Sequence, residues 1–297
     1  RDASIHYRDP ARDIDTAWSI PRLTLTGSDI NGPMRLSGVF APQNDAPGGT
    51  ITVDGELDML EDDRLAAEPT AAVRVTLEAF ALPAVLAQLG IATEPRFMAG
   101  TVDGTLEITC KGRTLAMPKS ELRFQAVQLH VAGRAHPLSL PGGTLTGKAT
   151  LDLDEDTLVL SDGSLAMTAL AADLACAGTI TQLRSRPTAR LQTELQADLA
   201  KTATYLRSAG LVPSLPERLE GALALSGPLA FGPDTFDASV ALRLTDLRLP
   251  VASLDAAHPA SGSLRGTFAM KANAQAVTGE GAISESGFTL PVAGLDA

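Results

Sequence analysis

Histidines and clustered acids are the side chains of this chain that could support metal or proton chemistry. Two of the histidines, His136 and His258, share the tripeptide Ala-His-Pro, which is more typical of a retained turn than of a proton-handling site. The acidic stretch at 152–156 has the charge of a calcium loop but lacks its glycine and its spaced terminal glutamate. We therefore expect no metal site.

Cys110 and Cys176 are the two cysteines, in the contexts EITCKG and DLACAG. Their apolar and small neighbours favour two buried thiols that act as small hydrophobes, and a disulfide is the alternative. Without partner histidines they cannot form a zinc site. The sequence also lacks a G-x-S-x-G elbow, an H-E-x-x-H pair, a P-loop and a dinucleotide-binding G-x-G-x-x-G. We expect neither an enzyme nor a bound cofactor.

A repeated aliphatic stripe is the feature that could bind a ligand. Apolar residues make up 44% of the 297 residues but aromatic residues only 4%. Leu, Val, Ile, Ala and Met occupy one set of alternating positions, while Thr, Ser, Asp, Glu, Arg and Gln occupy the other. Such a surface suits acyl chains, which bind through apolar area without fixed polar partners. The alternative is the core of a β-sandwich, which has the same alternation.

The elements that carry this stripe are strands. In the stretch 121–131, Leu122 and Phe124 alternate on even positions and Val127, Leu129 and Val131 on odd ones. The change of phase at Gln125-Ala126 predicts a bulge or a break between strands. The same pattern, including the change of phase, returns about 120 residues later at 240–251.

Similar segments recur along the rest of the chain and predict repeats of about 120 residues. We expect an irregular lead-in at 1–19, one repeat at 20–147, a second at 148–266, and the start of a truncated third at 267–297. Each full repeat holds many short strands and one short helix, at 81–91 and 201–211, and an acidic loop is expected at 61–71. Successive hairpins predict one continuous, elongated antiparallel sheet, with the shape of a rod.

Charge and hydropathy restrict the partners. The net charge of −11 argues against nucleic acid and against electrostatic docking on anionic lipid. No apolar run reaches 18 residues, so no segment is expected to cross a membrane as a helix. Because the chain opens at Arg1 without Met, we expect a piece of a longer protein whose targeting or anchoring segment lies outside it.

Four glycine-punctuated segments resemble a known family: TLTGSDINGPMRLSG, GTVDGTLEITCKG, its echo ERLEGALALSGPL, and ELRFQAVQLHVAG. With the short helices, they resemble the AsmA family of Gram-negative envelope proteins, which includes TamB-like and YhdP-like proteins, over residues 20–297. The resemblance implies a curved β-sheet folded into an open hydrophobic groove, a β-taco. It also implies periplasmic localisation, an inner-membrane anchor in a segment missing from this chain, and transfer of phospholipid between the inner and outer membranes, as in bridge-like lipid transfer proteins.

Carried over by position, the resemblance assigns the groove lining to the apolar residues of four strands. They are Val102, Leu106, Ile108, Leu122, Phe124, Val127, Leu129, Val131, Leu219, Leu223, Leu225, Leu242, Leu244, Leu247, Leu249 and Val251.

Three functions are compatible with the sequence, and each predicts a different structural feature. A non-enzymatic conduit for phospholipid or another acyl-chain lipid requires an open trough. A structural or assembly factor for outer-membrane protein biogenesis requires exposed strand edges and envelope protein partners. An adhesin-like stalk of separate sandwich domains is disfavoured by the helices.

Overall fold

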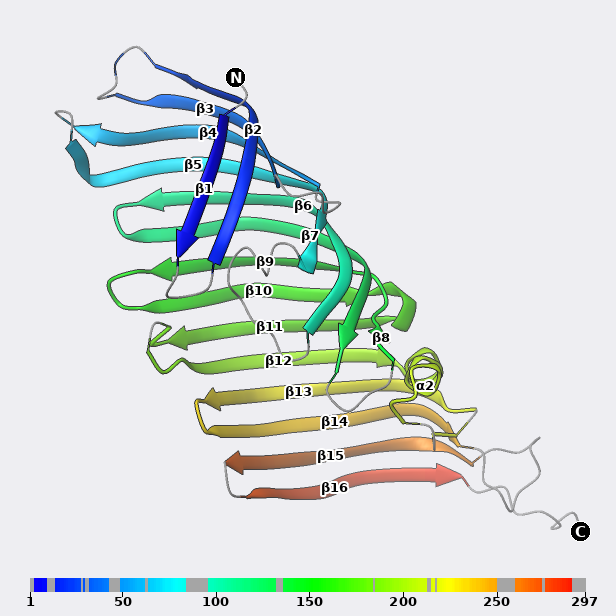
Figure 1. Cartoon of the computed structure of the whole chain (residues 1–297). Coiled ribbons are helices and arrows are strands. Elements are labelled where there is room, and N and C mark those ends of the chain that lie inside the picture. The colour runs from blue at the N-terminus through cyan, green and yellow to red at the C-terminus, as the bar shows by residue number, and fades with distance from the viewer. Residues whose placement is uncertain are drawn as a thin grey trace, which may run out of the picture. The chain divides into compact units, whose positions relative to one another are not determined.

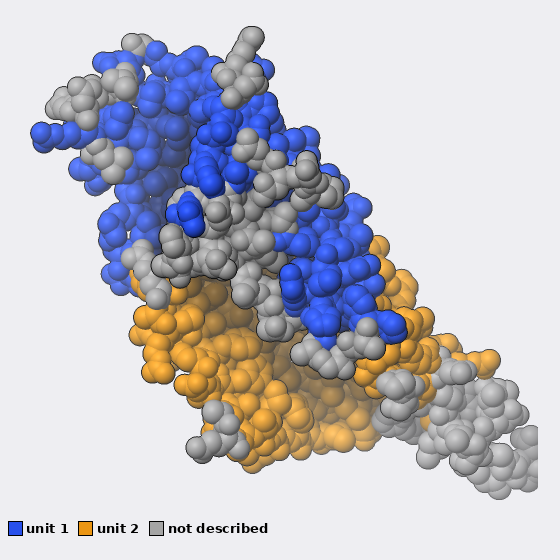
Figure 2. All heavy atoms as spheres, viewed as in Figure 1, with its two compact units in different colours: residues 1–155 blue, residues 156–297 orange. Residues whose placement is uncertain are grey.

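The computed structural model describes residues 3–9, 14–27, 29, 32–42, 49–61, 64–83, 96–131, 136–183, 185–212, 215–216, 218–249, 260–273 and 276–289. The chain divides into two compact units, residues 1–155 and residues 156–297 (Figure 2).

Unit 1 is an antiparallel meander (Figure 1). Its described strands are hydrogen-bonded in chain order from β1 to β7, β9 follows β7, and the short β8 also pairs with β7. They are β1 (Ala3–Asp9), β2 (Ile14–Thr26), β3 (Met34–Pro42), β4 (Thr50–Glu61), β5 (Arg64–Ala81), β6 (Arg96–Lys111), β7 (Thr114–His130), β8 (Leu138–Ser139) and β9 (Gly143–Asp152).

Unit 2 continues the same kind of meander, with described strands again paired in chain order. Its elements are β10 (Thr157–Met167), the 3-10 turn η1 (Thr168–Leu170), β11 (Ala172–Thr181), β12 (Thr188–Asp198), helix α2 (Leu199–Ser208), β13 (Glu220–Gly232), β14 (Thr235–Leu249), β15 (Ala260–Asn273) and β16 (Val277–Thr289). The predicted mostly β, antiparallel fold is confirmed.

Two local predictions were wrong. Residues 1–19 are not an irregular lead-in, because β1 and the first part of β2 pair there, with Ile5 opposite Trp18. Nor is 61–71 a loop, since β5 begins at Arg64 and pairs with β6 from Thr70 onward. In both places backbone pairing with a neighbouring strand outweighs a polar local composition.

The two predicted helices have different outcomes. The helix expected at 201–211 is α2, which begins at Leu199. Asp198 caps it by accepting a hydrogen bond from the Lys201 N–H at 2.9 Å. Of the helix expected at 81–91, Leu82 and Pro83 are helical and the remainder lies outside the described residues.

The predicted bulges are present at both changes of phase. Ala126 has φ 50° and is the extra residue between the pairs Ala99–Gln128 and Thr101–Gln125. Asp246 has φ 53° between the pairs Leu244–Leu264 and Leu247–Gly262. Because one residue is inserted, the apolar side chains before and after each bulge share one face of the sheet.

A glycine stands across from each bulge. Gly100 has φ 136°, and a Cβ there would lie 3.2 Å from the Val127 Cα. Gly221 has φ 129°, and its Cβ would lie 3.1 Å from the Leu247 Cα. The backbones approach too closely, and in too unusual a conformation, for a residue with a side chain. The two bulges are therefore built in the same way.

Unit 1 curls back over itself at its first strands. Although β3 and β4 separate β2 from β5 in the sheet, the Trp18 ring of β2 stacks on the Phe80 ring of β5. The ring centroids lie 6.0 Å apart with an interplanar angle of 7°, and β1 and β2 are drawn in front of the later strands in Figure 1. Three strand spacings in a flat sheet would separate the two backbones by about 14 Å. The contact therefore requires strong curvature of the sheet.

Candidate functional site

One face of unit 1 is aliphatic across its central strands. Val53 of β4, Val75 of β5 and Leu106 of β6 are in register and share this face. Phe124 and Leu122 of β7 join it, opposite Val102 and Gly104. Residues in register across a sheet project on the same side, so these rows form a continuous apolar surface.

Unit 2 has an apolar face of the same kind. One row runs through Leu174 of β11, Leu195 of β12, Leu225 of β13 and Leu242 of β14, and ends at Gly266 of β15. The bulge at Asp246 brings Leu247 to this face, and the Leu247 residue is only 6% exposed there. Each unit thus has a polar face and an apolar face.

The predicted lining residues with described side chains in the strands lie on these faces. Those of β6 and β7 project to the apolar face of unit 1, and Leu223, Leu225, Leu242, Leu244 and Leu247 project to the apolar face of unit 2. Val131 and Leu219 lie just outside the strands. Every predicted lining residue whose side chain is described is buried or half-buried, whereas Arg123, Gln125 and Gln128 of β7 are exposed. The side chains of Leu249 and Val251 lie outside the described part of the chain.

The apolar faces are not fully covered. No large side chain among the described residues is less than 2% exposed. Large apolar side chains that remain well exposed on these faces are Ile5, Leu23, Leu25 and Leu145 in unit 1, and Phe231, Phe268, Val277 and Ile283 in unit 2. Ile5, Val277 and Ile283 lie on the end strands β1 and β16, but the other five lie on strands with a neighbour on each side, where the packed core of a sandwich would leave few large apolar side chains exposed.

Helix α2 covers one end of the apolar face of unit 2. Tyr205 and Met167 pack against a cluster formed by Leu170, Ala172 and Ala197. Ala172 and Ala197 are in register on the apolar face, where β11 begins and β12 ends. The helix therefore lies at the ends of the strands, and the described contacts of the remaining strands are chiefly with their neighbours in the sheet.

The opposite face is charged and well solvated. In unit 1, Arg35 pairs with Asp54 at 3.6 Å and Arg74 with Glu107 at 2.8 Å. In unit 2, Arg265 pairs with Glu285 at 3.2 Å. Exposed pairs of this kind contribute at most about 1 kcal/mol each. Their main effect is to favour the native strand register, because a slip such as the one that moves Arg74 from Glu107 to a threonine would separate the paired charges.

Both cysteines are free and half-buried, and both lie on the apolar faces. Cys110 of unit 1 is opposite Ala71 and Leu115, and its thiol donates to the Gly112 carbonyl oxygen at 3.6 Å. Cys176 of unit 2 is opposite Gly163 and Thr193. Each unit therefore carries a native thiol among its aliphatic side chains.

The described residues contain no group of three metal-ligating side chains placed to hold an ion. No helix within the described ranges has both the length and the apolar composition needed to span a bilayer. The fold and the two kinds of face define the class of protein: an open antiparallel β-sheet protein with one apolar and one charged face in each unit. Comparison with protein-family models, curated proteins and solved structures finds no match to this chain.

Proposed function

We propose that this chain is a non-enzymatic lipid-transfer module that holds phospholipid acyl chains against the apolar faces of its sheet. The observation that carries the proposal is the set of aliphatic and aromatic side chains left exposed on those faces, Leu23, Leu25 and Phe268 among them. Acyl chains match this surface because they need apolar area and no hydrogen-bond partners. A chain that buries about ten methylenes gains about 8 kcal/mol.

The mechanism requires no covalent step. Acyl chains lie along the aliphatic rows, where side chains such as Leu225 and Leu242 offer similar contacts from strand to strand. The lipid headgroup stays in water at the strand ends, because burying a charged group without a partner is costly. Because the contacts at successive strands are similar, the free energy of the bound lipid has no deep minimum at any one strand. The lipid can therefore slide from one strand to the next.

The bulges support a groove built from repeats. Ala126 with Gly100 and Asp246 with Gly221 form the same bulge in the two units. A bulge bends its strand and increases its twist. We propose that these bends, with the curl marked by Trp18 and Phe80, fold the sheet lengthwise into a β-taco groove.

The compartment follows from the resemblance to the AsmA family. We propose that the module works in the periplasm of a Gram-negative bacterium, as part of a protein anchored in the inner membrane through a segment outside this chain. Phospholipid would then pass between the inner and outer membranes.

A scaffold for outer-membrane protein assembly is the second candidate. It is favoured by β16, whose described side chains from Val277 to Gly287 are all exposed and which pairs only with β15 among the described strands. Such an edge can accept a strand from another protein.

Native mass spectrometry separates the two candidates. The full chain is incubated with vesicles of phosphatidylethanolamine and phosphatidylglycerol, repurified, and its bound lipid extracted and identified. The lipid-transfer proposal predicts at least one phospholipid per chain. A chain that stays lipid-free, but binds an unfolded outer-membrane protein strand, would replace it with the scaffold.

A further inference from the structure

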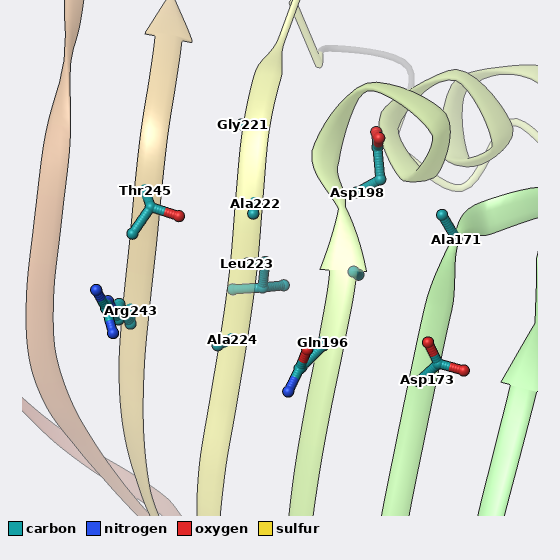
Figure 3. A pocket seen from close by; sticks show the side chains of 11 residues that line it. Ala171, Asp173, Gln196, Asp198, Gly221, Ala222, Leu223, Ala224, Arg243 and Thr245 are labelled. Carbon is teal, nitrogen blue, oxygen red and sulfur yellow. The ribbon is translucent and has the colours of Figure 1, made fainter.

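A cavity of about 480 Å³ lies on the polar face of unit 2 (Figure 3). Its floor includes Ala222 and Ala224 of β13, which alternate with the apolar-face residues Leu223 and Leu225. Because both alanines are small while the neighbouring strands carry longer side chains, the sheet surface is hollowed there. The charged side chains at the cavity, Asp173, Asp198 and Arg243, lie on the face opposite the proposed lipid surface, although Ala197 and Leu223 of the apolar face also border the cavity.

Opposite charges stand on the two sides of this hollow. Asp173 of β11, Gln196 of β12, Ala224 of β13 and Arg243 of β14 form one row in register. Asp198, at the end of β12, adds a second carboxylate on the acidic side. The alanine floor keeps the acidic side and the guanidinium apart.

The charge of Arg243 is not compensated within the described part of the chain. Its cross-strand neighbour on β15 is Arg265, a like charge directly opposite, and Arg265 pairs with Glu285 instead. Like charges in this position destabilise a sheet. Neither the Arg243 guanidinium nor the Asp173 carboxylate has a hydrogen bond or ion pair to another described residue. Both side chains can therefore bind a ligand without losing an existing partner. Asp198 uses Oδ1 to cap helix α2, which leaves its Oδ2 for a ligand.

We infer that this hollow, floored by Ala222 and Ala224, binds a small zwitterion, with its ammonium group toward Asp198 and Asp173 and its anionic group on Arg243. Asp198 shares its register row with Ala222 and Thr245, two residues along the sheet from the row of Arg243. The backbones of Asp198 and Arg243 are therefore two strand spacings apart across the sheet and two residues apart along it, about 12 Å on the diagonal. A hydrogen bond of about 2.8 Å at each end leaves about 6 Å for the ligand. Extended phosphoethanolamine has about this length from its ammonium nitrogen to a phosphate oxygen.

Isothermal titration calorimetry of the full chain tests the site with O-phosphoethanolamine, and with ethanolamine and inorganic phosphate as its separate halves. Because each half makes only one of the two charge-assisted contacts, the zwitterion is expected to bind about 10- to 100-fold more tightly than either half. If phosphoethanolamine binds no more tightly than phosphate, the inference is wrong.

Two variants locate the binding. Arg243→Gln removes the cation, and Ala224→Leu fills the floor without changing any charge, so each should weaken phosphoethanolamine binding at least about 10-fold. Ala241→Leu adds the same bulk on the polar face of β14, outside the cavity, and should bind like the unmodified chain. Circular dichroism confirms that each variant is folded. Unchanged binding by a folded Ala224→Leu chain would place the ligand elsewhere and overturn the assignment.

The source of the zwitterion is distinguished by two further probes. Binding of glycerophosphoethanolamine identifies the site as one for a lipid headgroup, whereas binding of β-alanine with exclusion of the glycerol diester identifies a free amino acid. Either result supports a zwitterion site, and binding of neither of these two probes nor of phosphoethanolamine contradicts it. The outcome is independent of acyl-chain binding on the opposite face.

Discussion

A chain that carries Leu25→Asp and Phe268→Asp should lose most of its bound phospholipid. Leu25 is 52% exposed and Phe268 47% exposed, one on the apolar face of each unit. Because these side chains are not packed in a core, the substitutions should leave the fold intact. They remove apolar contact worth about 0.8 kcal/mol per methylene and place a charge beside the acyl chain. Lipid affinity should fall on the order of 100-fold.

The matched control places the same charges on the other face. Thr26 directly follows Leu25, and Thr267 directly precedes Phe268. Both threonines are exposed and project to the polar face, where Thr26 is opposite Arg35. A Thr26→Asp and Thr267→Asp chain should load phospholipid like the unmodified protein in a vesicle co-sedimentation or native mass spectrometry assay. If both double variants lost the same amount of bound phospholipid, the face of the sheet that carries the charge would not determine lipid binding.

Replacing Phe80 by alanine should destabilise unit 1 by about 3–4 kcal/mol. Phe80 is 3% exposed and stacks on Trp18 across two intervening strands. Truncating a buried phenylalanine costs this much because apolar burial is lost and a cavity remains. Urea unfolding followed by circular dichroism measures the change in free energy.

The same substitution has an optical signature. Trp18 is the only tryptophan of the chain, so loss of the stack should shift its fluorescence emission to the red. Phe268→Ala in unit 2 is the control, because a half-exposed ring should cost less than about 1 kcal/mol and leave the Trp18 emission unchanged. An unshifted emission in the Phe80→Ala chain would indicate that the first strands do not fold over β5.

Local alternation was sufficient to predict the strands with one apolar face. It also predicted a bulge or a break between strands at Gln125-Ala126, because a change of phase must be absorbed there if one face is to stay apolar, and the structure has the bulge. Residues 64–71 show where this reasoning fails. That segment is rich in alanine, contains Glu68 and Pro69 and lacks strand-like alternation, yet it lies in a strand because its neighbours β4 and β6 offer backbone partners.

Features that depend on distant residues could not be predicted. The stacking of Trp18 on Phe80 depends on the accumulated curvature of the intervening strands, which no local pattern encodes. The polar hollow depends on the register that aligns Asp173, Gln196, Ala224 and Arg243. Only the small residues Ala222 and Ala224, amid longer polar residues on the same face, could have indicated it.

The labelling rate of the native thiols tests the central claim most directly. Cys110 and Cys176 are free and lie on the apolar face of unit 1 and of unit 2, respectively. Acyl chains bound to these faces should shield both thiols, so phospholipid should slow their reaction with a water-soluble maleimide by about 10-fold or more. A cysteine introduced at the exposed, outward-facing Ala177 should react at the same rate with and without lipid. If phospholipid leaves the rates of Cys110 and Cys176 unchanged, the acyl chains do not lie on the apolar faces.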